Sequence, residues 1–321
     1  MQGKIAIEEH FAIAETNGVK NRVVNPYWDG LSINLIEFES RRLREMDECG
    51  VELAIVSLNA PAVQAICDPK QAVEIARRAN DALAEQVRRR PHRFQGFAAL
   101  PLQDPEAAAL ELRRCMRDLG FRGALVNGYS NSPDGKQALY YDAPQYASFW
   151  AEAEALDAPF YLHPRDPLTN ERYDGHPWLI GSAWSFAEET ALHALRLMGS
   201  GLFDKHPNLQ LVLGHLGERI PYDIWRLDHR LQFRHDYPAR QKMGHYLRNN
   251  VHVTTSGHFR TQTLINAMLE MGSDRVMFAV DYPYEQHAPG AQWFDHCEIA
   301  EADRIKIGRD NARRLFKLNI E

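Results

Sequence analysis

Apolar, β-branched segments alternate with helical segments along the whole chain, and this alternation limits the possible folds more than any other feature. We expect strands at residues 4–10, 51–57, 94–100, 123–127, 159–163, 209–215, 251–255 and 275–281. Helices are expected at 38–48, 70–89, 105–119, 144–156, 184–203, 220–233, 261–271 and 302–318. Alternating strands and helices indicate parallel βα units, and eight such units close into a barrel. The sequence therefore predicts the α/β class and a (β/α)8 TIM-like barrel.

An open doubly wound sheet is the alternative architecture. It would place a glycine-rich phosphate turn after the first strand, but residues 8–11 read EEHF. A chain of 321 residues suits one barrel, so we predict a single domain over 1–321. Two long loops are expected, at about 11–37, which includes NPYWDG at 25–30, and at 164–182. Loops of this length more often form binding walls than neutral connections.

Composition excludes several classes of function. The net charge is -6 and acidic and basic residues are intermixed, which argues against a nucleic-acid partner. No apolar run is long enough to cross a bilayer and no signal-peptide core begins the chain, so a cytoplasmic protein without a membrane partner is expected. The 4 cysteines have no C-x-x-C spacing, which argues against disulfides and a cysteine zinc site.

The first expected strand ends in two residues that can bind a metal. Side chains alternate along a strand, so Glu8 and His10 should share a face, with their Cα atoms roughly 6.5 Å apart. On this pattern Ile5 and Ile7 take the opposite face, under the helices, and Ala6 lies below Glu8 on the inward face. A Glu-x-His pair alone fits a solvated strand end equally well.

Further potential ligands end other strands. Active sites of parallel barrels lie at the C-terminal ends of the strands, where His163, His215 and Asp281 join Glu8 and His10. Each alone more often caps a helix or contacts a loop, but their coincidence favours a divalent metal site. Two imidazoles and two carboxylates, from Glu8, His10, His163 and Asp281, suit Zn²⁺ or Mn²⁺ better than Mg²⁺.

This ligand set is formally neutral once a divalent ion is bound, so an anionic substrate would need additional positive charge. Arg226 follows His215 by about three helical turns and is a candidate for that contact. A surface arginine is an equally good interpretation from the residues alone.

Five motifs carry a resemblance to a known family: EEHF at 8–11, YLHP at 161–164, LGHLGE at 213–218, FAVDYPYE at 278–285 and NARRLF at 311–316. Together they resemble the metal-dependent decarboxylase branch of the amidohydrolase superfamily over essentially the whole chain. The resemblance implies an amidohydrolase-type barrel and metal ligation by Glu8, His10, His163 and Asp281. It also implies that His215, Glu218 and Arg226 line the substrate site, and that the protein is a homo-oligomer, a tetramer.

Within that branch the motifs are most similar to those of hydroxybenzoate decarboxylases. The implied reaction is reversible, non-oxidative loss of CO₂ from an ortho-hydroxybenzoate, a small aromatic carboxylate. γ-Resorcylate (2,6-dihydroxybenzoate), which would give resorcinol, is the expected substrate, and 2,3-dihydroxybenzoate is the alternative. Many members of the superfamily begin with His-x-His, whereas this chain has Glu-x-His.

The expected chemistry avoids an in-plane aryl carbanion by protonating the carboxyl-bearing carbon first. We assign Asp281 as the proton donor, with His215, held by Glu218, as its electrostatic or proton-relay partner. A metal-dependent hydrolase of a lactone or amide, with Asp281 as general base, remains the alternative class. The superfamily's carboxylated bridging lysine has no counterpart, because Asn127 ends the fourth strand, and this argues against a binuclear hydrolase.

Overall fold

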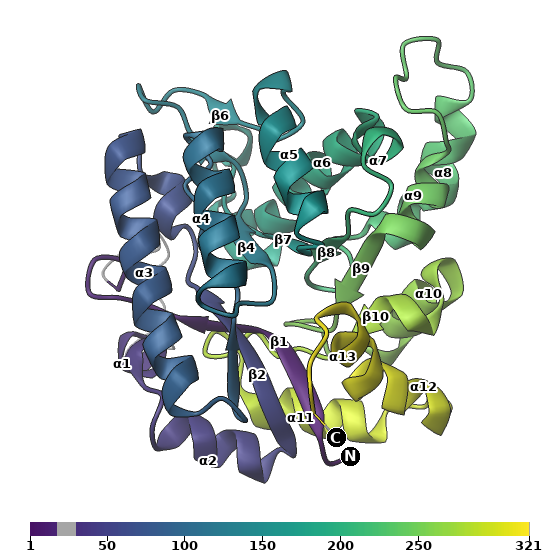
Figure 1. Cartoon of the computed structure of the whole chain (residues 1–321). Helices are drawn as coiled ribbons and strands as arrows, with labels where there is room; N and C mark the ends of the chain where they lie inside the picture. Colours follow the sequence, from purple (N-terminus) through teal and green to yellow (C-terminus); the bar gives the residue numbers. More distant parts are fainter. Residues whose placement is uncertain (18–29, 321) are drawn as a thin grey trace.

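The computed structural model describes residues 1–17 and 30–320 and contains eight parallel strands. They form two sheets, in the orders β1-β2-β3 and β10-β9-β8-β7-β4. The bounds are β1 (Lys4–Phe11), β2 (Val51–Leu58), β3 (Phe94–Gly96), β4 (Ala124–Asn127), β7 (Phe160–His163), β8 (Leu211–Leu213), β9 (Val251–Thr254) and β10 (Val276–Met277). Figure 1 shows these strands at the centre of the molecule with the helices around them.

Two isolated parallel bridges join the sheets into a ring. Glu9 pairs with Tyr282 just beyond β10, and the His10 amide donates to the Tyr282 carbonyl at 2.6 Å. On the other side Ala98, just beyond β3, pairs with Ala124 of β4. Every strand thus has two parallel neighbours, and the prediction of a (β/α)8 barrel is confirmed.

The helices follow the strands in the expected alternation (Figure 1). Two of them begin at an aspartate followed by proline: Asp68 accepts from the Lys70 amide, and Asp104 accepts from the Ala107 amide. The helices are α1 (Leu31–Ile36), α2 (Arg41–Glu48), α3 (Pro69–Arg89), α4 (Pro105–Arg117), α5 (Ala147–Ala155), α6 (Ser185–Gly199), α7 (Leu202–Lys205), α8 (Ile220–Leu231), α9 (Met243–Asn250), α10 (Thr261–Met271), α11 (His287–His296), α12 (Glu301–Ile305) and α13 (Asn311–Leu315).

The first strand departs from simple alternation. Its pairing with β2 shifts between Ala6 and Glu9, where three steps along β1 match two steps along β2. This irregularity is a β-bulge, which turns side chains on either side of it to the same face. Ile5 and Ile7 therefore lie inside the barrel, and Ala6 lies in the outer core. The predicted faces of these three residues were wrong.

The inner core fills the barrel below the strand ends. It consists of inward side chains from six strands together with residues of the C-terminal segment: Ile5, Ile7, Leu53, Ile55, Phe97, Leu125, Tyr161, Val212, Met277, Ala279, Ala312, Phe316 and Leu318. The outer core packs the other faces of the strands against the helices. The mouth of the barrel thus stands on a closed apolar layer.

Several elements were not expected. Helices α9 and α11 form where no helix was predicted, and a short hairpin, β5 (Ser130–Asn131) with β6 (Ala138–Leu139), follows β4. Helix α11 contains Pro289 and Gly290, which disfavour helices. Gly290 is required there because a Cβ would lie 2.8 Å from the Phe259 ring. Packing therefore overrides propensity in this helix.

The predicted last helix, 302–318, is interrupted. A π-helical turn (Lys306–Asp310) separates α12 from α13, and the Phe278 amide donates to the Ile307 carbonyl of this turn at 2.8 Å. The two long loops also contain local structure. Helix α1 lies within the first, of which residues 18–29 are outside the described part, and the second holds three 3₁₀ turns, at Glu171–Tyr173, Pro177–Leu179 and Gly181–Ala183.

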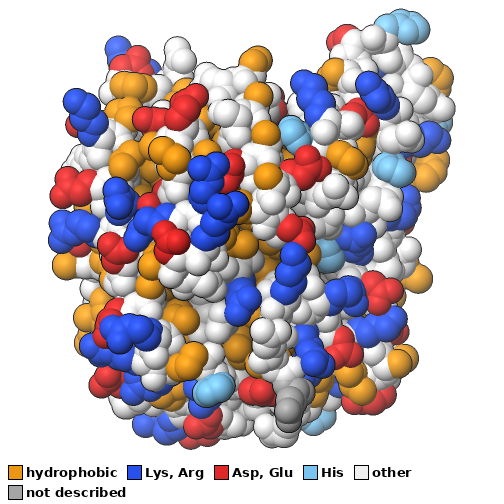
Figure 2. All heavy atoms as spheres, viewed as in Figure 1, with side chains coloured by type: hydrophobic (Ala, Val, Ile, Leu, Met, Phe, Trp, Pro, Cys, Tyr) orange, Lys and Arg blue, Asp and Glu red, His pale blue; other side chains and the backbone are white. Residues whose placement is uncertain are grey.

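The surface carries interspersed charge. On the face shown in Figure 2, acidic and basic side chains lie among one another and among apolar ones. Arg113 and Glu152, for example, form an ion pair at 2.6 Å between α4 and α5. Within the described residues, no helix has both the length and the apolar character needed to cross a bilayer.

Candidate functional site

The four predicted metal ligands converge at the C-terminal mouth of the barrel. One ligand atom from each of Glu8, His10, His163 and Asp281 lies within 4.8 Å of the others. Nε2 of His10 is 3.0 Å from Oδ1 of Asp281, and Nε2 of His163 is 3.4 Å from Oε1 of Glu8. Residues from strands far apart in the sequence thus form one compact donor set.

The far side of each imidazole ring is occupied. Nδ1 of His163 donates to the Pro164 carbonyl at 3.0 Å, and Nδ1 of His10 is hydrogen-bonded to Ser57 Oγ at 3.1 Å. A carbonyl can only accept, so His163 carries a proton on Nδ1 and directs Nε2 at the centre. Such outer partners fix ring orientation and tautomer in metal sites.

Glu8 is held through one oxygen only. Its Oε2 accepts from Thr254 Oγ1 at 3.0 Å, and also from the hydroxyls of Tyr161 and Ser256. Its Oε1 is buried without a hydrogen-bond partner. The carboxylate is therefore anchored from behind and presents one free oxygen to the centre.

The donor set fits a divalent cation. Glu8 Oε1, His10 Nε2 and Asp281 Oδ1 are all buried, and none has a hydrogen bond of good geometry with any described residue. Buried polar atoms normally have hydrogen-bond partners. Three buried atoms that lack partners and face one point therefore indicate that a ligand binds between them. Two carboxylate oxygens and two imidazole nitrogens are a donor set for Mn²⁺ or Zn²⁺.

The electrostatics of the cluster favour ionised carboxylates. Burial alone would raise the pKa of Glu8, but His215, His163 and His10 outweigh burial and lower it well below its usual value. Burial likewise opposes ionisation of Asp281, while the neighbouring imidazoles of His10 and His215 lower its pKa. Both carboxylates therefore favour the ionised form, which binds a cation.

His215 and Glu218 form a second pair beside the ligands. Nδ1 of His215 donates to Glu218 Oε1 at 2.7 Å, and its Nε2 lies 3.7 Å from Asp281 Oδ2 and 3.9 Å from Glu8 Oε1. Burial disfavours the imidazolium, yet Glu218 and Glu8 raise the pKa of His215 well above its usual value. The predicted neighbours His215, Glu218 and Asp281 therefore do lie together.

An unusual turn creates this pair. His215, Leu216, Glu218 and Arg219 have φ of 49°, 55°, 50° and 70°, and Gly217 between them has φ of 86°. Left-handed conformations of this kind cost non-glycine residues of order 1–3 kcal/mol each and cluster at functional sites. The Leu216 amide donates to the Thr254 carbonyl at 2.7 Å, which holds the turn against β9.

Two glycines allow the close packing of the site. A Cβ on Gly214 would lie 2.9 and 3.1 Å from the two carboxylate oxygens of Glu8. A Cβ on Gly257, whose φ is +56°, would lie 3.1 Å from His215 Cδ2. Gly214 thus borders Glu8 and Gly257 borders His215, so a side chain at either position would displace a predicted site residue.

Arg226 is the one predicted site residue that the structure does not bring into this cluster. Its side chain is exposed on α8, and no hydrogen bond or ion pair links it to another described residue. The supporting residues Ser57, Tyr161, Thr254 and Ser256 were missed. For Tyr161 a signal existed, because it precedes His163 by two positions and must share its inward face.

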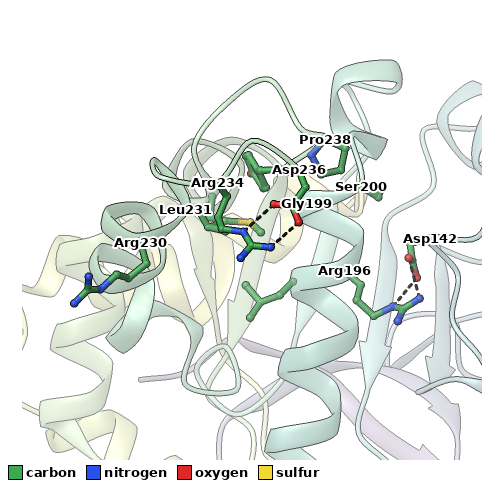
Figure 3. Close-up of a pocket in the computed structure, with 12 residues that line it drawn as sticks. Asp142, Arg196, Gly199, Ser200, Arg230, Leu231, Arg234, Asp236 and Pro238 are labelled. Atoms are coloured by element: carbon green, nitrogen blue, oxygen red, sulfur yellow. Dashed lines mark hydrogen bonds and ion pairs between the residues drawn. The ribbon is translucent and has the colours of Figure 1, made fainter.

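A surface cavity lies elsewhere. It measures about 680 Å³ and lies beside α6 and the end of α8 (Figure 3). Its charged side chains largely satisfy one another: Arg196 pairs with Asp142 at 2.9 Å and Arg234 hydrogen-bonds to Asp236 at 2.8 Å. None of the predicted metal ligands lines it.

Residues 35–318 match the amidohydrolase family, so the chain belongs to this family. Within it, the chain is 59% identical over 325 aligned residues to a γ-resorcylate decarboxylase of Rhizobium radiobacter, covering 99% of each protein. A γ-resorcylate decarboxylase of Rhodococcus jostii is also 59% identical, over 99% of this chain and 100% of that protein.

Solved structures give the same result. A crystal structure of a 2,6-dihydroxybenzoate decarboxylase in complex with 2,6-dihydroxybenzoate superposes with a TM-score of 0.97 at 58% identity, over 100% of both chains. A dihydroxybenzoic acid decarboxylase of Polaromonas, solved with manganese and the inhibitor 2-nitroresorcinol, has a TM-score of 0.96 at 55% identity. It covers 100% of this chain and 98% of that one. The predicted resemblance is confirmed.

Proposed function

We propose that this protein is a metal-dependent decarboxylase that converts γ-resorcylate to resorcinol and CO₂. One observation carries the proposal: three buried, unpartnered ligand atoms meet at the mouth of a barrel that is 58% identical to a decarboxylase solved with this compound. The reaction should run backwards in concentrated bicarbonate.

Glu8, His10, His163 and Asp281 would hold one divalent ion per chain. We favour Mn²⁺ because a relative of 55% identity was solved with bound manganese, and Zn²⁺ is the second choice. When bound, the ion would supply Lewis acidity at the substrate's carboxylate and ortho hydroxyl.

Asp281 is the proposed proton donor to the carboxyl-bearing carbon. Its Oδ1 faces the ligand cluster, whereas its Oδ2 faces His215 at 3.7 Å. The substrate hydroxyl can pass its proton to Asp281 on binding, which resolves the conflict between ligation and acid catalysis. The carboxyl-bearing carbon then receives that proton. The C–C bond to the carboxylate breaks, CO₂ leaves, and the electron pair of that bond returns to the ring.

His215 is the proposed electrostatic partner of Asp281. Glu218, itself buried, orients the ring through Nδ1 and stabilises its cationic form. The imidazolium then faces the negative charge of the substrate with Nε2. Removing Glu218 should therefore act through His215, without loss of metal.

Arg226 keeps a role only at longer range. We propose that its exposed guanidinium on α8 attracts the anionic substrate toward the mouth, because α8 begins five residues after His215.

We also propose a homotetramer in the cytoplasm, built from one barrel domain over residues 1–321. Exposed aromatic side chains on α8, with Tyr222 at 79% and Trp225 at 69% exposure, support a subunit contact there.

A panel of ortho- and para-hydroxybenzoates tests the proposal. γ-Resorcylate should lose CO₂ fastest, salicylate should be slower by about ten- to a hundredfold in kcat/KM, and 4-hydroxybenzoate should not react. A preference for 2,3-dihydroxybenzoate would move the assignment to that acid. Hydrolysis of a lactone or amide without CO₂ exchange in bicarbonate would instead identify a hydrolase.

A further inference from the structure

Asn127 lies beside a metal ligand and has no role in the proposed mechanism. It ends β4 and pairs in parallel register with His163, the last residue of β7. Residues paired in register point to the same face of a sheet, so the Asn127 side chain is directed into the barrel with that of His163. It is 2% exposed.

The orientation of its amide is fixed by two donated hydrogen bonds. Nδ2 of Asn127 donates to the carbonyls of Asn59 at 3.2 Å and Leu58 at 3.4 Å. Both partners can only accept, so the nitrogen must be on that side and Oδ1 on the other. Oδ1 is buried and has no hydrogen-bond partner among the described residues.

Another buried asparagine shows the usual situation. Asn80, 1% exposed, donates to Ala99 and Glu111, and its Oδ1 accepts from the Ala99 amide at 2.8 Å. Oδ1 of Asn127 accepts no such hydrogen bond from any described residue. A buried acceptor without a donor is destabilising, so its presence at the mouth of the site indicates a donor that arrives with the ligand.

A second acceptor of the same kind lies next to it. Asn59, 4% exposed, follows the end of β2 and donates to the Thr16 carbonyl at 3.2 Å, while its Oδ1 is also unpartnered. Asn127 and Asn59 therefore place two buried acceptor oxygens without partners among the described residues at or just beyond the ends of β4 and β2. These oxygens suit a neutral donor such as a ring hydroxyl and do not suit a carboxylate.

We propose that Oδ1 of Asn127 accepts a hydrogen bond from the substrate's second ortho hydroxyl, the one that does not chelate the metal. This inference rests on the proposed function and makes Asn127 the residue that distinguishes a 2,6-dihydroxybenzoate from salicylate. A ring with hydrogen at that position leaves the acceptor buried and unpartnered, and it therefore binds more weakly.

The most direct test compares two inhibitors that undergo no decarboxylation. 2-Nitroresorcinol and 2-nitrophenol differ only by the second hydroxyl, so the ratio of their Kd values reports on its contact. Wild-type protein loaded with Mn²⁺ should bind 2-nitroresorcinol about tenfold more tightly. In Asn127→Ala the two compounds should bind with nearly equal Kd, whereas the control Asn80→Ala should keep the wild-type ratio. An unchanged ratio in a folded Asn127→Ala protein that binds Mn²⁺ normally would overturn the inference.

A second measurement does not depend on the variant. Wild-type protein should bind 6-aminosalicylate, whose amino group can donate, about as well as γ-resorcylate, and 6-fluorosalicylate about as poorly as salicylate. Equal binding of the fluoro and amino compounds would also overturn the inference. The proposed function is tested by a separate result: it would be wrong if wild-type protein released no CO₂ from γ-resorcylate.

Discussion

At the scale of single residues, three of the four proposed metal ligands, Glu8, His10 and His163, are held by one atom and free at another. Glu8 is anchored through Oε2 and His163 through Nδ1, while Oε1 and Nε2 face the centre. This division keeps the free atoms in place before any ion binds, so little reorganisation is needed on binding. Residues that contact Glu8 Oε2 or His163 Nδ1 are therefore expected to affect metal binding without contacting the ion.

Asp281 is predicted to be the most sensitive position for the chemical step. Asp281→Asn should keep some Mn²⁺, because an amide oxygen can still coordinate, but kcat should fall by more than the roughly 10²–10⁴-fold typical of one acid-base group. Single-turnover rates with γ-resorcylate and metal analysis measure both effects. Glu48→Gln, at an exposed carboxylate on α2, serves as a control with nearly unchanged kcat. If Asp281→Asn kept more than a tenth of wild-type kcat, the proton would come from another group.

Gly214 is predicted to control metal affinity without binding metal. In Gly214→Ala the new Cβ would meet the Glu8 carboxylate at 2.9 Å and displace its free oxygen. We expect Mn²⁺ affinity to fall by about 10- to 100-fold, measured by calorimetry. Gly30→Ala is the control, because its φ of -103° suits any residue and a Cβ there would lie no closer than 3.9 Å to another side chain. Unchanged Mn²⁺ affinity in Gly214→Ala would show that Glu8 adapts freely.

At the scale of elements, hydrophobic patterning was sufficient to predict the eight strands, their parallel order and the convergence of Glu8, His10, His163 and Asp281 at the strand ends. It could not predict the bulge in β1, because period-two alternation contains no signal for an inserted residue, and so Ile5 and Ile7 were assigned to the wrong face. The left-handed turn from His215 to Arg219 was also unpredictable, since four of its five residues are not glycine. Tertiary contacts such as the one from Leu216 to β9 stabilise it.

Helix α8 shows a further limit of sequence reasoning. Its spacing after His215 suggested that Arg226 contacts the substrate, but the helix turns this side chain to solvent. Arg226→Ala should therefore raise KM for γ-resorcylate at low salt with little change in kcat, and added salt should remove the difference. Arg230→Ala, one turn later on α8, is the matched control. A large fall in kcat in Arg226→Ala would instead indicate that Arg226 contacts the substrate directly.

At the scale of the whole molecule, the barrel separates stability from function. The inner core closes the barrel below the ligands, and the free atoms collect at one end. The exposed aromatic side chains on α8 lie outside both regions. Light scattering should give four times the chain mass of 36.8 kDa, and Trp225→Glu should reduce it. A wild-type monomer would contradict the proposed tetramer.

Decarboxylation is proposed to depend on one ion held by Glu8, His10, His163 and Asp281. Titrating metal-free protein with Mn²⁺ while following loss of γ-resorcylate and release of CO₂ tests it most directly. Turnover should be absent without metal, rise in proportion to added Mn²⁺ and level off at one ion per chain, whereas Glu8→Ala should bind little Mn²⁺ and gain little activity. Full turnover by the metal-free protein would contradict the account.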